Sequence, residues 1–272
     1  MNMQNYGLKH YENESVEEDI PLLKEEEITY SVLISILRRP CAHVYTNHES
    51  VIICYSSAPY PVWIWCKDAQ KEDVKRIADC LKNEFPIEEG YRYNLSCELL
   101  DELKEEDEYF ASIPVKMSLL SYRLSFIRPF LKKCEGELTT PQLEDLDILA
   151  KYWHDATKEM EEFDFDYEHC INTVLKKIED GSMYVWVNDD KKIVALCNYD
   201  NEGEYCKISG VYTLPDERRK GYALNLVKEV TQNILDEDLI PILYTNANFE
   251  ASNACYKKIG YKSVGRLCTV GN

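Results

Sequence analysis

The sequence is short of basic residues and of long apolar stretches. Its 31 Lys and Arg stand against 49 Asp and Glu, which gives a formal net charge of -18 at pH 7. Because binding to a nucleic-acid backbone needs a basic surface, this balance argues against a nucleic-acid partner. No apolar run approaches the roughly 20 residues that a membrane-spanning helix needs. The first residues, Met1 to Asn5, lack the basic and apolar regions of a secretory signal. We therefore expect neither a nucleic-acid nor a membrane partner.

The 11 cysteines form no C-x-x-C pair, and the 5 histidines show no ligand spacing. The sequence therefore predicts neither a zinc ribbon nor a thioredoxin motif, and no metal site. An odd cysteine count without a signal segment favours a reducing, cytoplasmic location. Cys54, Cys66 and Cys197 follow apolar residues, so we interpret the cysteines as mostly small apolar members of the core.

The chain of 272 residues is long enough for one large or two small domains. The segment from Pro129 to Gly136 combines a proline, a glycine and a basic pair, and the pattern of elements restarts after it. We predict an N-terminal α/β domain at 1–132 and a second domain at 133–272.

In the N-terminal half, residues 1–20 are polar and acidic, and we expect them to fray. The spacing of apolar residues predicts helices at 22–37, 71–85 and 95–107, strands at 43–46, 51–55 and 62–66, and one or two strands within 109–127.

After the boundary, the same patterns predict an alternation of strands and helices. Strands are expected at 137–139, 183–188, 193–199, 204–213, 241–246 and 261–269, and helices at 141–154, 166–180, 220–235 and 251–259. This order predicts a mixed α/β sheet with helices on its faces.

The stretch 209–224 carries the clearest chemical signal. Strand-forming residues at 211–213 are followed by Pro215, which cannot donate to a sheet and so ends the strand. The run 218–220 is the only one of three consecutive basic residues, and the small Gly221 follows it at the start of the predicted helix. Exposed N–H groups at a helix N-terminus, bare backbone and nearby bases predict an anion site, with phosphate as the usual ligand.

Two motifs in this half resemble the GNAT superfamily, the acyl-CoA-dependent N-acyltransferases. The run from Arg218 to Ala223 fits the family's Q/R-x-x-G-x-G/A loop, and the run from Asn253 to Tyr261 fits its N-x-x-Y-x-K-x-G-F/Y segment. The resemblance covers roughly residues 137–272. It implies a mostly antiparallel sheet flanked by helices, acetyl-CoA as the acyl donor without a metal, and a primary amine on a small molecule or peptide as the acceptor.

The resemblance also implies roles for individual residues. Residues 211–213 would pair with the pantetheine arm through their backbone, and the N–H groups of 219–224 would hold the pyrophosphate. Tyr256 would act as the general acid that protonates the departing thiolate, while the amine attacks the thioester directly and a backbone N–H near Val211 polarises its carbonyl. The full predicted cofactor-binding set is Val211, Tyr212, Thr213, Arg218, Arg219, Lys220, Gly221, Tyr222, Ala223, Leu224 and Asn253.

Several alternatives stay open at this stage. The donor can instead be a longer acyl-CoA, or the chain can be a CoA-binding regulatory module without turnover. The general base is not marked by any motif; Glu204, Glu161, Glu162 and a chain of waters are candidates. The N-terminal half resembles a degenerate copy of the same fold without the phosphate loop. We expect it to wall the acceptor cleft or to mediate self-association, for example as a homodimer.

Overall fold

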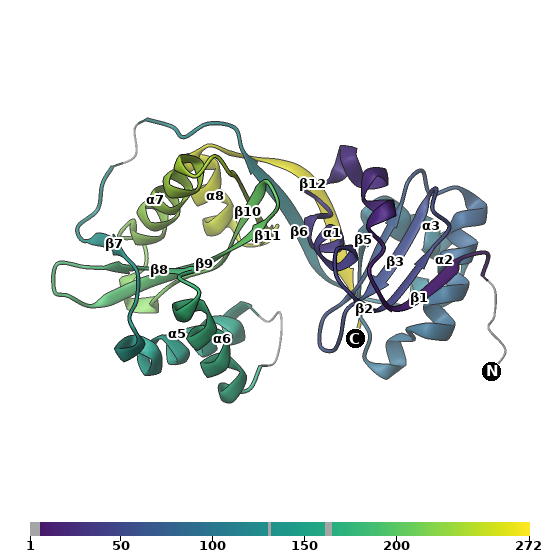
Figure 1. Cartoon of the computed structure of the whole chain (residues 1–272), viewed down its shortest axis with the longest axis horizontal. Coiled ribbons are helices and arrows are strands. Elements are labelled where there is room, and N and C mark those ends of the chain that lie inside the picture. Colours follow the sequence, from purple (N-terminus) through teal and green to yellow (C-terminus); the bar gives the residue numbers. More distant parts are fainter. Residues whose placement is uncertain (1–5, 130–131, 161–164) are drawn as a thin grey trace. The chain divides into compact units, whose positions relative to one another are not determined.

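The computed structural model describes residues 6–129, 132–160 and 165–272, which form two compact units (Figure 1). Unit 1 holds the described residues up to Ser121 together with Thr245–Asn248 and Ser263–Asn272, and unit 2 holds Tyr122–Tyr244 and Phe249–Lys262. Both units are discontinuous because the chain passes between them four times, three times within a strand and once between Asn248 and Phe249. The predicted domains, 1–132 and 133–272, divide the chain only once, and that division stays a prediction.

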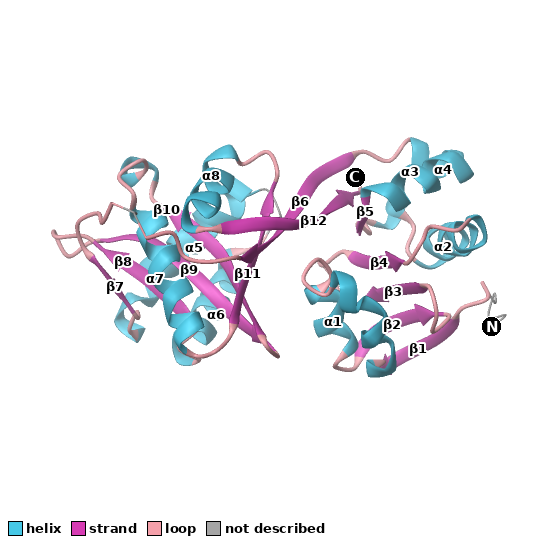
Figure 2. Ribbon diagram, turned by 90° about the horizontal axis from the view of Figure 1, so that it is seen from above, coloured by secondary structure: helices cyan, strands magenta, loops and turns pink. Residues whose placement is uncertain are grey.

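Unit 1 is an α/β unit whose strands are ordered β1-β2-β3-β4-β5-β12 (Figure 2). Its strands are β1 (Lys9–Glu14), β2 (Cys41–Thr46), β3 (Val51–Tyr55), β4 (Val62–Cys66) and β5 (Tyr93–Ser96), with most of β6 (Val115–Leu124) and β12 (Tyr261–Val270). Its helical segments are η1 (Glu17–Glu26), α1 (Ser31–Leu37), α2 (Lys71–Glu84), η2 (Ile87–Glu89), α3 (Cys97–Glu106) and α4 (Glu108–Ala111).

The structure confirms the strands predicted at 43–46, 51–55 and 62–66 and the helix predicted at 71–85. The prediction that residues 1–20 fray is wrong for residues 9–14, because β1 pairs with β2 from Lys9 to Glu14, and residues 1–5 lie outside the described residues. The helix predicted at 22–37 is divided into η1 and α1. The strand β5 was not predicted because it has only four residues and leads directly into α3. Its last residue, Ser96, is the N-cap of α3, and its hydroxyl oxygen accepts a hydrogen bond from the Leu99 N–H at 3.1 Å.

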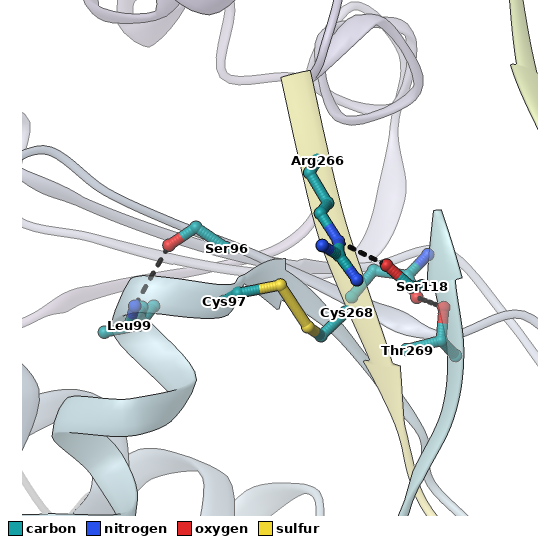
Figure 3. The surroundings of a disulfide bond; sticks show 8 residues. Ser96, Cys97, Leu99, Ser118, Arg266, Cys268 and Thr269 are labelled. Carbon is teal, nitrogen blue, oxygen red and sulfur yellow. Dashed lines mark hydrogen bonds between the residues drawn. A yellow bond between two sulfur atoms is a disulfide. The ribbon is translucent and has the colours of Figure 1, made fainter. Parts of the chain in front are cut away.

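A disulfide joins Cys97, the first residue of α3, to Cys268 in β12, with their Cα atoms 5.5 Å apart (Figure 3). The antiparallel pairing of β12 with β5, which sets Cys268 opposite Leu95, brings the two cysteines together. The sequence does not predict this link, whereas five of the eight other cysteines whose side chains the structure describes are buried, as the interpretation of the cysteines as mostly core residues expects. No sequence signal marks the pair, since 171 residues separate its members.

Unit 2 is an α/β unit whose strands are ordered β11-β10-β9-β8-β7. Its strands are β7 (Glu137–Thr139), β8 (Met183–Val187), β9 (Ile193–Glu202), β10 (Tyr205–Thr213) and most of β11 (Ile240–Asn246). Its helical segments are η3 (Leu143–Asp145), α5 (Leu146–Met160), α6 (Tyr167–Glu179), η4 (Pro215–Glu217), α7 (Tyr222–Asp236) and α8 (Glu250–Ile259). This is the order predicted for residues 137–272.

Helices cover both faces of the unit 2 sheet. Figure 1 shows α7 and α8 on one face and α5 and α6 on the other. On the α5 and α6 face, apolar residues of the two helices and of β8 to β10 form one buried cluster that includes Leu149, Val174 and Leu196. The chain therefore has the predicted class, a mixed and mostly antiparallel α/β sheet flanked by helices.

The two units repeat one order of elements. In each, a strand is followed by helical segments, three antiparallel strands, a helix, a strand parallel to the third, and a second helix. In unit 1 the parallel pair is β4 with β5, and in unit 2 it is β10 with β11. This repeat agrees with the interpretation of the N-terminal half as a reduced copy of the same fold. Among the described residues no helix is long and apolar enough to cross a membrane.

Candidate functional site

The strand β10 changes partners along its length. From Tyr205 to Ile208 it pairs in parallel with Ile240–Leu243 of β11, and among the described residues that pairing ends there. On its other side, β10 stays paired with β9 as far as Thr213, with a bulge between Ser209 and Tyr212. The edge of β10 at 211–213 that faces away from β9 is therefore where an extended ligand can pair as an added strand. The Thr213 Oγ1 is buried and has no hydrogen-bond partner in the described structure.

The strand leads into the N-terminus of α7, which no side chain caps. Its N-cap is Gly221, with φ 96°, so no side chain bonds the first N–H groups of the helix, and the first turn contains no acidic residue. The first four N–H groups of an α-helix have no partner within the helix, and they carry the positive end of its dipole. The helix start at Gly221 therefore suits an anion, and the role of Tyr222, Ala223 and Leu224 in binding phosphate stays a prediction.

The three bases before Gly221 differ in their surroundings. The Arg218 guanidinium pairs with Glu159 of α5 at 2.5 Å and donates from Nε to the Thr213 carbonyl at 3.1 Å. Lys220 pairs with Glu217 at 2.6 Å. The pKa values of Arg218 and Lys220 are both raised, first by these hydrogen bonds to carboxylates. Both side chains therefore hold the loop in shape, whereas Arg219 has φ 65° and is exposed, with no ion pair in the described structure.

The segment before β7 lies against the start of α7. The Tyr222 hydroxyl donates to the Glu135 carboxylate, and the Asn225 amide donates to the carbonyls of Lys132 at 3.3 Å and Gly221 at 3.0 Å. Sequence reasoning treated this segment only as a domain boundary. Its basic pair, Lys132 and Lys133, is exposed, so it adds positive charge near the loop.

The helix α8 carries Asn253 and Tyr256 as predicted. The Asn253 amide accepts from the Tyr122 hydroxyl at 2.9 Å and donates to the Phe249 carbonyl at 2.8 Å, so it links β6 to the start of α8. Its predicted contact with pantetheine stays a prediction. Tyr256 is 6% exposed, and burial raises the pKa of its phenol. A raised pKa keeps the hydroxyl protonated near neutral pH, as a general acid requires.

The candidate bases are less well placed. Glu204 immediately precedes β10, seven residues before Val211, and at about 3.3 Å per residue the two positions lie roughly 20 Å apart. Glu204 is therefore unsuited to accept a proton near Val211. Glu161 and Glu162 lie outside the described residues.

The bulge of β10 is closely covered by α5. Gly210 has φ 59°, and a Cβ atom built on it would overlap the ring of Trp153. The position therefore requires glycine for two reasons, the left-handed backbone and the indole above it. No sequence motif marks this contact, since Trp153 and Gly210 are far apart in the chain.

The substitution Gly210→Ala tests this contact. We expect it to lower the free energy of unfolding by about 2 to 4 kcal/mol, because it adds left-handed strain to an overpacked site. Urea unfolding measures the change. Gly181→Ala is the matched control: Gly181 has φ 65° but open space around it, so only the backbone cost of about 1 to 2 kcal/mol should appear. Equal losses in the two variants would contradict a tight contact with Trp153.

Parts of the chain are similar to known proteins. Residues 188–269 match the family model described as FR47-like protein. The chain is 29% identical over 111 residues to the β-lysine N(6)-acetyltransferase of Methanosarcina mazei, a match that covers 38% of this chain and 41% of that protein. The chain thus spans about two fifths of the length of this curated relative.

Solved structures share the fold over nearly the whole chain. A GNAT-family acetyltransferase from Colwellia psychrerythraea has a TM-score of 0.62 at 13% identity, covering 96% of this chain and 98% of that one. A GCN5-related N-acetyltransferase from Sphaerobacter thermophilus has a TM-score of 0.63 at 12% identity, covering 99% and 96%. At these identities the likeness concerns the fold alone.

Proposed function

We propose that the C-terminal half of this chain is a GNAT-type domain that transfers an acetyl group from acetyl-CoA to a primary amine, supported by the family-model match and the shared fold. The observation that carries the proposal is the course of β10. The strand leaves β11 after Ile208 and leads, within unit 2, to the uncapped N-terminus of α7 at Gly221.

The open edge of β10 suits the pantetheine arm. Its amides can pair with the backbone of 211–213, and the buried Thr213 Oγ1 offers a further polar partner. The N–H groups of 219–224 then donate hydrogen bonds to the pyrophosphate. The exposed Arg219, Lys132 and Lys133 add positive charge nearby, which lowers the electrostatic energy of the negatively charged pyrophosphate. Arg218 and Lys220 hold the loop in shape through their ion pairs with Glu159 and Glu217.

The chemistry is a direct transfer. The neutral amine attacks the thioester carbonyl, so a C–N bond forms and the C–S bond breaks. The attacking nitrogen loses a proton to a base, and the departing thiolate gains one from the Tyr256 hydroxyl. The Val211 N–H, at the bulge, polarises the thioester carbonyl as charge develops on its oxygen. Acetyl-CoA supplies only the activated acyl group.

The start of α2 in the described part of unit 1 does not favour a second phosphate site. The first turn of α2, which corresponds to α7 in the repeated order, contains Asp73, which is 7% exposed. Its carboxylate pairs with Arg76 at 2.8 Å and accepts from the Ser50 hydroxyl at 2.5 Å. A fixed carboxylate at the start of α2 would repel a phosphate group bound at the same helix N-terminus. This repulsion supports the proposal of a single CoA site in the chain. Self-association through this unit stays a prediction.

A thiol-release screen tests the proposed function. Acetyl-CoA is incubated with the protein and with amino acids including β-lysine, polyamines, aminoglycosides or peptides with free N-termini. We expect at least one primary amine to release free CoA thiol and to be recovered as its amide. Turnover only with longer acyl-CoA donors would identify a different acyltransferase. CoA binding without release of thiol for any amine would identify a binding module.

A further inference from the structure

The strand β9 carries a buried amide that the transfer chemistry above does not use. Asn198 is 1% exposed, and its Oδ1 has no hydrogen-bond partner in the described structure. It stands opposite Ser209, the residue at which the bulge of β10 begins. Buried polar groups are nearly always hydrogen-bonded, so the unpaired carbonyl oxygen of Asn198 points to a missing partner.

The side chain of Asn198 reaches the bulge itself. A Cβ atom built on Gly210 would lie 3.3 Å from the Asn198 Nδ2, and the same atom would overlap the Trp153 ring. The amide, the glycine and the indole therefore meet at one point of the sheet. Leu196, two residues before Asn198, packs in the cluster beneath α5 and α6. Since side chains two apart in a strand share a face, Asn198 belongs to the α5 side of the sheet, with Trp153.

The missing partner must donate a hydrogen bond, because a carbonyl oxygen only accepts. The thioester carbonyl that the Val211 N–H polarises cannot serve, since it too accepts. The attacking amine can serve, because it carries N–H groups and must approach the same bulge. In the structure the Nδ2 end of the amide is the end nearest Gly210, and the Oδ1 end is the one that lacks a partner.

We propose that Asn198 is a positioning residue for the acceptor, whose amine N–H it receives at the bulge, and that Trp153 restricts the acceptor to an unbranched aliphatic primary amine. This proposal rests on the proposed function. Trp153 is half-buried and lies directly over Gly210, so a slender chain passes beside it more readily than a branched or bulky one. The uncharged amide also suits the reaction. A carboxylate at this place would hold the amine as an ammonium ion, which has no lone pair for attack.

Calorimetry on the whole chain tests the proposal. L-lysine, putrescine and n-butylamine are titrated into the protein with and without saturating CoA, and acetyl-CoA is titrated separately. The wild-type chain should bind at least one of these amines, and Asn198→Leu should weaken that binding about tenfold or more through loss of a buried hydrogen bond. The affinity for acetyl-CoA should not change.

Two further measurements separate positioning from a structural role. Asn198→Leu should leave the melting temperature unchanged or raise it, because leucine of similar shape replaces an unpaired buried amide. A structural asparagine would lower it. Asn198→Asp should move the pH profile of kcat/KM to higher pH, since a buried carboxylate keeps the amine protonated. Asn201→Leu, an exposed position on the same strand, is the matched control and should change none of these values.

Equal amine affinity in the wild-type chain and Asn198→Leu would overturn the proposal. So would the absence of binding by all three amines to the wild-type chain. Neither result would contradict the proposed function if acetyl-CoA still binds and another class of amine, such as an aminoglycoside, is still acetylated with release of the CoA thiol. If the wild-type chain did not bind acetyl-CoA at all, that result would instead refute the proposed function itself.

Discussion

Gly221→Asp is expected to weaken acetyl-CoA binding at least about 100-fold, a change of roughly 3 kcal/mol. The substitution places a negative charge at the uncapped start of α7, where the pyrophosphate would receive hydrogen bonds from the helix N–H groups. Like charges at this site repel, and the carboxylate can itself bond the N–H groups that the phosphate needs. Isothermal calorimetry with acetyl-CoA measures the change directly.

The control for this substitution must carry the same backbone cost. Gly221 has φ 96°, and any other residue there is strained. Gly90 has φ 90° with open space around a built Cβ, so Gly90→Asp carries the same charge and a similar strain of about 1 to 2 kcal/mol. We expect Gly90→Asp to lower stability alone. An unchanged acetyl-CoA affinity in Gly221→Asp would refute the placement of the pyrophosphate.

Tyr256→Phe is expected to lower kcat about 100- to 1,000-fold while acetyl-CoA affinity stays the same. The phenol donates a proton to the thiolate only as the C–S bond breaks, so its removal affects the transition state and not the bound donor. Burial raises the pKa of Tyr256, so its proton stays available across the neutral range. The fall in kcat should become smaller as the pH rises above about 8.5, the ordinary pKa of a thiol. Above that pH CoA is stable as the free thiolate, so its departure does not need a proton from an acid.

A neighbouring tyrosine provides the control. Tyr261 is 2% exposed, and its hydroxyl shares a hydrogen bond of 2.8 Å with Thr231. Tyr261→Phe should therefore cost about 1 to 2 kcal/mol of stability without a comparable fall in kcat. If Tyr256→Phe kept the wild-type rate at neutral pH, or if both variants lost rate equally, Tyr256 would not be the general acid.

The fold of unit 2 follows closely from its sequence because its elements are long and strongly patterned. The helix predicted at 220–235 is observed as Tyr222–Asp236, and the strand predicted at 241–246 as Ile240–Asn246. Unit 1 was less predictable where local signals are weak. All six residues of β1 are exposed or half-buried, so no apolar alternation marks them, and only pairing with β2 makes them a strand.

The features of the candidate site likewise fall into those that the sequence predicts and those that it does not. The uncapped helix at Gly221 and the position of Tyr256 follow from local motifs, since a glycine at a helix start and a tyrosine one turn after an asparagine are features of short segments. The pairing of Arg218 with Glu159, the cover of Trp153 over Gly210 and the unpaired oxygen of Asn198 depend on contacts between distant segments. A single sequence carries no signal for such contacts. The disulfide between Cys97 and Cys268 was missed for the same reason.

A crystal structure of the protein with CoA would decide where the ligand lies. The arrangement of β10 and α7 predicts the pyrophosphate on the N–H groups of 219–224 and the pantetheine arm along the backbone of 211–213, with its sulfur directed toward the Tyr256 hydroxyl. CoA bound beside α2 in unit 1, or a pyrophosphate held away from the start of α7, would contradict that arrangement and with it the proposed acetyl transfer at this site.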